Sequence, residues 1–148
     1  MSYQERRSII NILSSLLIFG GYAYYVFQIN GEENMLLIKD FTFWAKYILI
    51  LIPVSIVSKI IVYIIFAIVN AIATREEMPS ITDERDKLIE LKSERVTHYL
   101  FLFGFLMAMV VLLTDWPQYY MFIVLIGMGL VSEVIGEITK FYYYRKGV

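Results

Sequence analysis

A few ionisable side chains lie inside the long apolar stretches of this chain, where a charged group is costly. Lys59, Glu133 and Glu137 each lie within such a stretch. An ionised group at membrane depth costs roughly 2.5–3.5 kcal/mol on insertion scales, so each is a candidate functional residue. His98, the single histidine, and Asn11 lie near the ends of two other apolar stretches. We therefore treat these five residues as one polar intramembrane cluster.

Counting along the expected helices places the cluster at one depth. Lys59 lies 18 residues after Phe41, and Glu133 lies 16 residues after Pro117. Phe41 and Pro117 both begin an apolar stretch on the same side of the membrane in the topology given below. The other members of the cluster lie at comparable distances from that side. The side chains are therefore expected to meet in the inner leaflet.

The cluster predicts ion pairs between helices. Lys59 is expected to pair with Glu133, or with Glu137 one helical turn deeper. Arg95 and His98 are the candidates for the remaining carboxylate. Two interpretations follow. In one, the ion pairs only fix the register of apolar helices. In the other, they line a cytosol-facing cavity that binds a proton, an ion or a small polar ligand, because a desolvated carboxylate beside a lysine can change its charge with occupancy.

The elements that position these residues are membrane-spanning helices. The chain is 59% hydrophobic with a mean hydropathy of +0.64, whereas soluble domains are about 45–50% apolar. A helix needs about 20 apolar residues to cross a bilayer. Four runs meet this length, at about residues 9–27, 41–73, 96–113 and 119–143. We predict an all-α fold, a four-helix bundle forming a single domain over residues 1–148, with a tight hairpin between the third and fourth spans.

The basic residues predict the orientation of the bundle. Cytosolic loops carry an excess of Lys and Arg. One side of the predicted topology holds most of them, namely Arg6, Arg7, Arg75, Arg85, Lys87, Lys92, Arg95, Lys140, Arg145 and Lys146. The other side holds Lys39 and Lys46. Both termini are therefore expected in the cytosol, and the chain is expected to be a multi-pass protein of the bacterial inner membrane.

The long polar segment at residues 75–95 is predicted to be a cytosolic helical arm that continues without a break into the third span. Pro79 ends the preceding helix, and Ser80 with Asp83 resembles a capping box. The overlong second span and the arm are expected to form a cytosolic helical hairpin. The arm is either a solvated connector or a docking surface for a cytosolic protein partner at residues 80–95.

A short charged motif opens this arm. It reads Asp83-Glu84-Arg85-Asp86 and is followed by Ile89, Ser93, Arg95 and Tyr99. It resembles the D-E-R-[DE] motif that opens the helix into the third span in a family of small four-span membrane proteins of bacteria and archaea, classed as a domain of unknown function. The resemblance implies the fold and the topology but no activity. It also puts forward Asp83, Glu84, Arg85 and Arg95 as positions of interest.

Several classes of function are disfavoured by composition. The chain has no cysteine, which excludes disulfides and thiolate chemistry, and one histidine, which excludes a multi-histidine metal centre within one chain. A net charge of −1 gives no electrostatic basis for nucleic-acid binding. The usual hydrolase, metalloprotease and nucleotide-binding motifs are missing. No catalytic residue, metal site or cofactor is predicted, and an enzyme is disfavoured.

Two functional hypotheses remain. The first is a non-enzymatic sensor, immunity or regulatory factor that acts through the arm and the polar cluster as a homo-oligomer. The second is a small proton- or ion-coupled transporter that uses Glu133, Lys59 and His98. A membrane-embedded enzyme would need an additional cofactor bound at the cluster.

Overall fold

The computed structural model describes residues 2–30, 34–74 and 84–147, which form an all-helical structure. The helices are α1 (Tyr3–Asn30), α2 (Asn34–Leu37), α3 (Phe41–Thr74), α4 (Glu84–Val111) and α5 (Tyr120–Lys146). By length and composition, α1, α3, α4 and α5 can each cross a membrane. The four predicted spans are thus confirmed as helices, and α4 joins the end of the arm to the third span without a break.

Helix α1 begins earlier than expected, at Tyr3 and not near residue 9. The cause is a capping box that the sequence analysis overlooked. The backbone N–H of Glu5 donates to Ser2 Oγ at 3.2 Å, and the Ser2 backbone N–H donates to Glu5 Oε2 at 2.9 Å. This reciprocal pair satisfies two donors that a helix start otherwise leaves without partners. Helix α1 therefore includes the polar residues that precede its apolar stretch.

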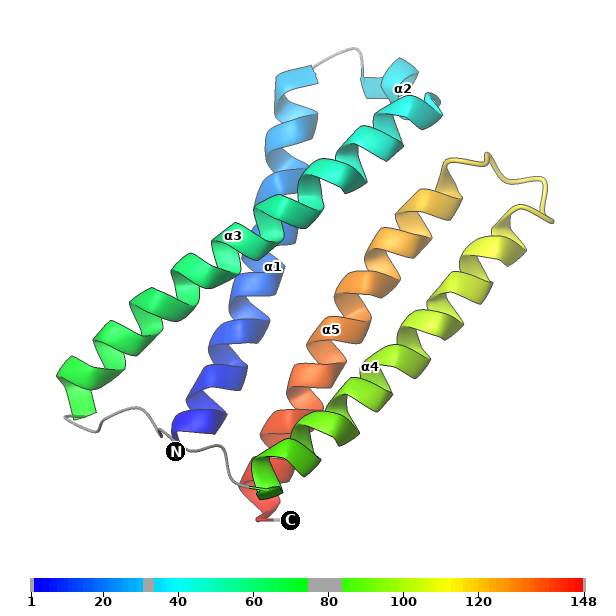
Figure 1. The fold of residues 1–148 in the computed structure, drawn as a ribbon. Helices are drawn as coiled ribbons and strands as arrows, with labels where there is room; N and C mark the ends of the chain where they lie inside the picture. Colours follow the sequence, from blue (N-terminus) through cyan, green and yellow to red (C-terminus); the bar gives the residue numbers. More distant parts are fainter. Residues whose placement is uncertain (1, 31–33, 75–83, 148) are drawn as a thin grey trace.

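The long helices lie in the order α3, α1, α5, α4, because the packed pairs are α4–α5, α1–α5 and α1–α3. Figure 1 shows both termini and the start of α4 at one end of the molecule, here called the terminal end. The opposite end, where α1 leads to α2 and α4 turns into α5, is called the loop end. The fold is consequently an open row of helices with α3 and α4 on its two sides.

The arm packs differently from the expected hairpin. Its predicted partner, the end of α3, makes no comparable contact with α4 in the described residues, so that expectation is wrong. The start of α4 packs on the last turns of α5 instead. Ile89 and Ser93 are buried, and Lys92 Nζ lies 5.1 Å from the centre of the Tyr143 ring. Gln4 of α1 adds a hydrogen bond to Asp86 at 3.5 Å. The predicted capping box at residues 80–83 lies outside the described residues.

Small residues allow α4 and α5 to approach closely, as predicted for a tight hairpin. A Cβ atom added to Gly104 of α4 would overlap with Cβ of Met128, and one added to Gly136 of α5 would overlap with Oγ1 of Thr97. Ser93 and Ser132 are also fully or almost fully buried on these facing sides. In a bilayer, such close contact between backbones is a main source of helix association.

Aromatic side chains hold α3 to its neighbours at the loop end. The Trp44 and Phe122 rings stack with centroids 5.7 Å apart, and those of Tyr22 and Tyr47 lie 4.8 Å apart. The Trp44 indole N–H also donates to the backbone carbonyl of Ile38 at 2.8 Å. These contacts bring α3 against both α1 and α5 at this end. The predicted polar cluster around Lys59 and Glu133 lies between them and the terminal end.

Candidate functional site

An ion pair between α3 and α5 is the centre of the site. Lys59 Nζ pairs with Glu133 Oε1, as the sequence predicted. The hydroxyl of Ser15 on α1 donates to the same carboxylate oxygen at 3.0 Å. One carboxylate of α5 therefore holds a cation from α3 and a hydroxyl from α1. The side chains of Lys59 and Glu133 keep 38% and 28% of their surface exposed, so the pair lies at the edge of an opening and not in a closed core.

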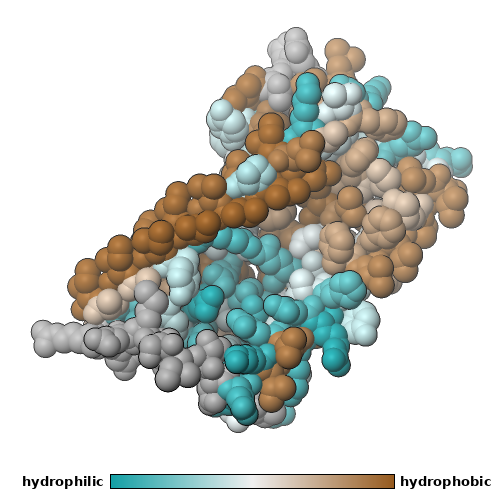
Figure 2. Space-filling model, viewed as in Figure 1, coloured by the Kyte–Doolittle hydropathy of each residue, from teal (hydrophilic) through white to brown (hydrophobic). Residues whose placement is uncertain are grey.

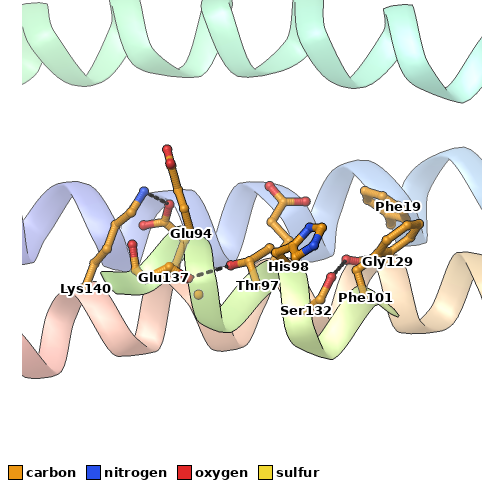
Figure 3. A pocket seen from close by; sticks show the side chains of 12 residues that line it. Phe19, Glu94, Thr97, His98, Phe101, Gly129, Ser132, Glu137 and Lys140 are labelled. Atoms are coloured by element: carbon orange, nitrogen blue, oxygen red, sulfur yellow. Dashed lines mark hydrogen bonds and ion pairs between the residues drawn. The ribbon is translucent and has the colours of Figure 1, made fainter. Parts of the chain in front are cut away.

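This opening is a cavity of about 570 Å³ between α1, α4 and α5. Its lining consists of Phe19, Ser93, Glu94, Thr97, His98, Phe101, Gly129, Ser132, Glu133, Gly136, Glu137 and Lys140. Figure 3 shows Phe19 and Phe101 together at one end of this cavity and Glu137 with Lys140 at the other. Three carboxylates and a histidine thus share one hollow, which is large enough for a small organic molecule. We call it the polar cavity.

The second carboxylate of the predicted cluster has a different partner from those expected. Lys140, one turn further along α5, pairs with Glu137 Oε1 at 3.1 Å. Lys140 therefore takes the role for which Arg95 and His98 were the candidates. His98 lines the polar cavity without making this ion pair, and Arg95 is exposed on α4 outside the lining. In the sequence analysis, Lys140 was counted only among the basic residues of the cytosolic side. Its spacing of three positions from Glu137 on the same helix is the signal for this pair.

Asn11 belongs to a neighbouring, smaller space. It lines a hollow of about 20 Å³, together with Gln4, Arg7, Ser8, Glu90, Glu137, Lys140 and Tyr144. A space of this size suits about one water molecule. Glu137 and Lys140 line both this hollow and the polar cavity. The predicted cluster is therefore two connected groups, one around Lys59 and Glu133 and one nearer the terminal end.

An apolar cavity of about 340 Å³ adjoins the polar one and is bounded by α3. The two cavities share Phe19, Phe101, Gly129 and Glu133 as lining residues. The remaining lining of the apolar cavity is Ile48, Leu51, Ile52, Ser55, Ile56, Leu125 and Ile126. Figure 2 shows the same division on the surface, where α3 forms an apolar ridge and polar side chains gather beneath it toward the terminal end. The ion pair lies where the two environments meet.

The arm residues put forward by the sequence lie apart from both cavities. Glu84, Arg85 and Arg95 are exposed, and Asp83 lies outside the described residues. Glu94 is a lining residue that the sequence analysis did not identify. Its position four residues before His98 on α4 is the signal that could have revealed it, because residues at this spacing share a helix face.

The chemistry available here is charge pairing and hydrogen bonding. Within residues 2–30, 34–74 and 84–147, no group of three or more His, Asp or Glu side chains is placed to hold a metal ion. The Ser132 hydroxyl donates to the carbonyl of Gly129 at 2.8 Å, and the Thr97 hydroxyl donates to that of Ser93 at 3.1 Å. Both hydroxyls are thus engaged by the backbone of their own helices. The carboxylates and the His98 imidazole are the groups that remain to interact with a bound molecule.

No family model matches this chain, and neither a curated protein nor a solved structure is similar to it. The resemblance carried by the Asp83-Glu84-Arg85-Asp86 motif therefore stays a prediction.

Proposed function

We propose that this chain is a non-enzymatic sensor, immunity or regulatory factor of the bacterial inner membrane. A small molecule occupies the polar cavity, and occupancy changes the surface that the start of α4 offers to a cytosolic protein. The observation that carries this proposal is the 570 Å³ cavity itself, with the Lys59–Glu133 ion pair at its edge. A pair that only fixed helix register would be expected in a filled interior.

Helix α4 supports the link between cavity and arm. It is one helix from Glu84 to Val111, so the lining residues and the exposed arm lie on the same rigid element. Its cavity-facing side includes Glu94 and His98, and its arm exposes Leu88 and Leu91. A displacement of α4 by a bound molecule would move these leucines. An exposed apolar pair next to charged residues is suited to contact with a protein partner or with a second copy of the chain.

The membrane orientation belongs to the same proposal. The two termini and the start of α4 lie at one end, where most of the basic residues of the sequence also fall. By the positive-inside tendency, this end is cytosolic. The arm and the polar cavity, which lies toward the same end, would then both face the cytosol. The family suggested by the arm motif has the same layout.

Cysteine labelling tests this orientation, since the chain has no cysteine of its own. Gln118→Cys at the loop end and Arg145→Cys at the terminal end are both at exposed positions. A membrane-impermeant maleimide is expected to label Gln118→Cys in cells whose outer membrane alone is permeabilised. Arg145→Cys should react only after the inner membrane is opened as well. The opposite pattern, or equal labelling of both, would contradict the topology.

The second candidate function, a proton- or ion-coupled transporter, is favoured by one observation. Glu133 contacts Lys59 of α3 and Ser15 of α1 through the same oxygen. Protonation of this carboxylate would remove the charge that attracts Lys59 and so weaken the contact of α3 with α5 on the terminal side of their aromatic contacts. Such a change of helix contacts with proton occupancy is what a coupled carrier requires, and His98 in the same cavity offers a further proton-binding group.

Proteoliposomes can separate the two functions in one preparation. A fluorophore attached at Leu88→Cys, which is 57% exposed in the native chain, reports on the arm. Glu133→Gln is expected to shift the emission of this label, because it removes the same charge that protonation or a bound cation would neutralise. Asp115→Asn makes the same chemical change at an exposed loop-end position and should leave the emission unchanged.

A pH-sensitive dye trapped inside the same vesicles tests the transporter. The sensor proposal expects no collapse of an imposed proton gradient beyond that of empty vesicles. A gradient that the native chain dissipates and Glu133→Gln preserves would replace the sensor by the transporter. An unchanged arm emission together with no proton flux would contradict both.

A further inference from the structure

We infer that the ligand of this site is an amphiphilic amine, with its positively charged head in the polar cavity and its apolar tail in the adjoining cavity beside α3. This inference rests on the proposed function, since it names the class of molecule that occupies the same site.

The shape of the site indicates an amphiphile. The two cavities, of about 570 Å³ and 340 Å³, share four lining residues and therefore lie directly next to each other. One is lined by ionisable groups, and the other, apart from Ser55 and the shared Glu133, by apolar side chains. A small inorganic ion or a proton would leave the apolar part without an occupant. A molecule with one polar and one apolar end fills both.

The charges around the polar part indicate a cation. The lining contributes Glu94 and His98 from α4, together with Glu133, Glu137 and Lys140 from α5. Lys59 reaches Glu133 from α3, and α1 contributes Phe19 and the Ser15 hydroxyl but no charge. Three carboxylates therefore face two lysine ammonium groups. Among these carboxylate and ammonium groups one negative charge is in excess, which attracts a cationic head and repels an anionic one.

One further feature favours an amine with N–H donors. In the part of the chain that the structure describes, Glu137 Oε2 is buried without a hydrogen-bond partner. Glu137 lines the polar cavity, where the head would lie. A buried carboxylate oxygen without a donor is costly, and an ammonium head supplies up to three donors. Phe19 and Phe101, at the junction of the cavities, offer apolar ring surface to the carbons that follow the head.

The arrangement of helices supplies an entry route. Helix α3 and Phe101 of α4 line the same apolar cavity, although α3 and α4 are not a packed pair in the described residues. An amphiphile dissolved in the bilayer can therefore enter sideways between these helices, tail and head together. Once inside, its ammonium group competes with Lys59 for Glu133, which weakens the link between α3 and α5.

Calorimetric titration of the full chain in lipid nanodiscs tests the inference, with empty nanodiscs as the blank for partition into lipid. Three probes share one tail: octylamine, octanol and octanoate. Octylamine is expected to bind saturably and at least about tenfold more tightly than the other two, since tenfold corresponds to about 1.4 kcal/mol, the order of one charge-assisted hydrogen bond. Glu133→Gln and Glu137→Gln should each weaken octylamine binding by about tenfold.

Phe101→Ala changes the cavity without removing an ion pair. A loss of binding in this variant therefore does not arise from a disturbed contact between α3 and α5. The substitution should weaken octylamine binding by about threefold, because it removes apolar ring surface from the junction of the two cavities. Asp115→Asn is the matched control for the carboxylate variants and should bind as the native chain does. Circular dichroism melting confirms that each variant is folded.

Two results would overturn the inference, and they differ in what they say of the proposed function. Equal binding of the three probes, weakened by Phe101→Ala, would reject the amine and keep the cavity as a binding site. Octylamine binding that is absent, or that none of the three cavity variants changes, would reject the amine and remove the ligand site on which the proposed function depends.

Discussion

Lys59→Met is expected to lower the free energy of unfolding by about 2–3 kcal/mol, although methionine suits an apolar helix better than lysine does. The substitution leaves the Glu133 carboxylate with only the Ser15 hydroxyl as a partner. Removing one member of a buried pair costs about 3–5 kcal/mol because the other charge loses its compensation. We take a lower value because 28% of the Glu133 side chain is exposed. The measurement is a denaturant titration in mixed micelles.

The double variant Lys59→Met/Glu133→Gln completes the argument. Neutralising both members removes the uncompensated charge, so at least half of the lost stability should return. Lys46→Met is the matched control, since Lys46 is an exposed lysine on the same helix near the loop end. Its effect should lie within about 0.5 kcal/mol of zero, as is usual for surface positions. Equal losses for Lys46→Met and Lys59→Met would show that the ion pair contributes nothing specific.

Gly104→Ala is expected to lower the stability of the α4–α5 pair by about 1–3 kcal/mol, the usual cost of overpacking. The added methyl group would overlap with Cβ of Met128, and Cγ of Met128 lies 2.7 Å away. The Cγ atom can move with the side-chain torsion, but Cβ is fixed by the backbone of α5, so the helices themselves must separate. Thermal unfolding followed by circular dichroism would record the loss as a lower melting temperature.

Gly127→Ala is the control for this prediction, because it adds the same methyl group within α5. Nothing lies within 4 Å of a Cβ atom at Gly127. Alanine is preferred to glycine in a helix by up to about 1 kcal/mol, so this variant should be neutral or more stable. If Gly104→Ala and Gly127→Ala raised the melting temperature alike, close packing at Gly104 would not be what holds α4 to α5.

Much of this architecture could be predicted from the sequence because a bilayer imposes simple requirements. The length of apolar runs gave the helices, and the bounds of α3 agree closely with the prediction at residues 41–73. The facing of Lys59 and Glu133 followed from their similar depth along the two spans. Ser132 and Gly136, the small residues beside Glu133 on α5, are buried. Each of these inferences depends on the sequence of one helix, or on the number of residues from the membrane surface along two helices.

The rest depends on how the helices are placed relative to one another, which such counts do not contain. The expected pairing of the arm with α3 was wrong because α5 continues to Lys146 and offers the arm a longer surface. The apolar cavity beside α3 could not be predicted either, since a sequence that fills an interior and one that leaves it open look alike in composition. The partner of Glu137 was not predicted because the ion pairs were expected between helices, whereas Lys140 lies on the same helix as Glu137.

The length of α3 has one further consequence. Its 34 residues extend about 50 Å at 1.5 Å per residue, whereas the hydrocarbon region of a bilayer is about 30 Å thick. A helix with this mismatch tilts, and the tilt follows the thickness of the surrounding lipid. On the terminal side, α3 is held to α1 by the contacts of Tyr3 with Phe66 and of Arg7 with Tyr63, whereas no comparable contact joins it to α4 in the described residues. A change of tilt would therefore act on the side of α3 that faces α4 and widen or narrow the sideways entrance. Acyl-chain length in the host membrane would then set how easily the site fills, which makes lipid composition itself an input to the protein.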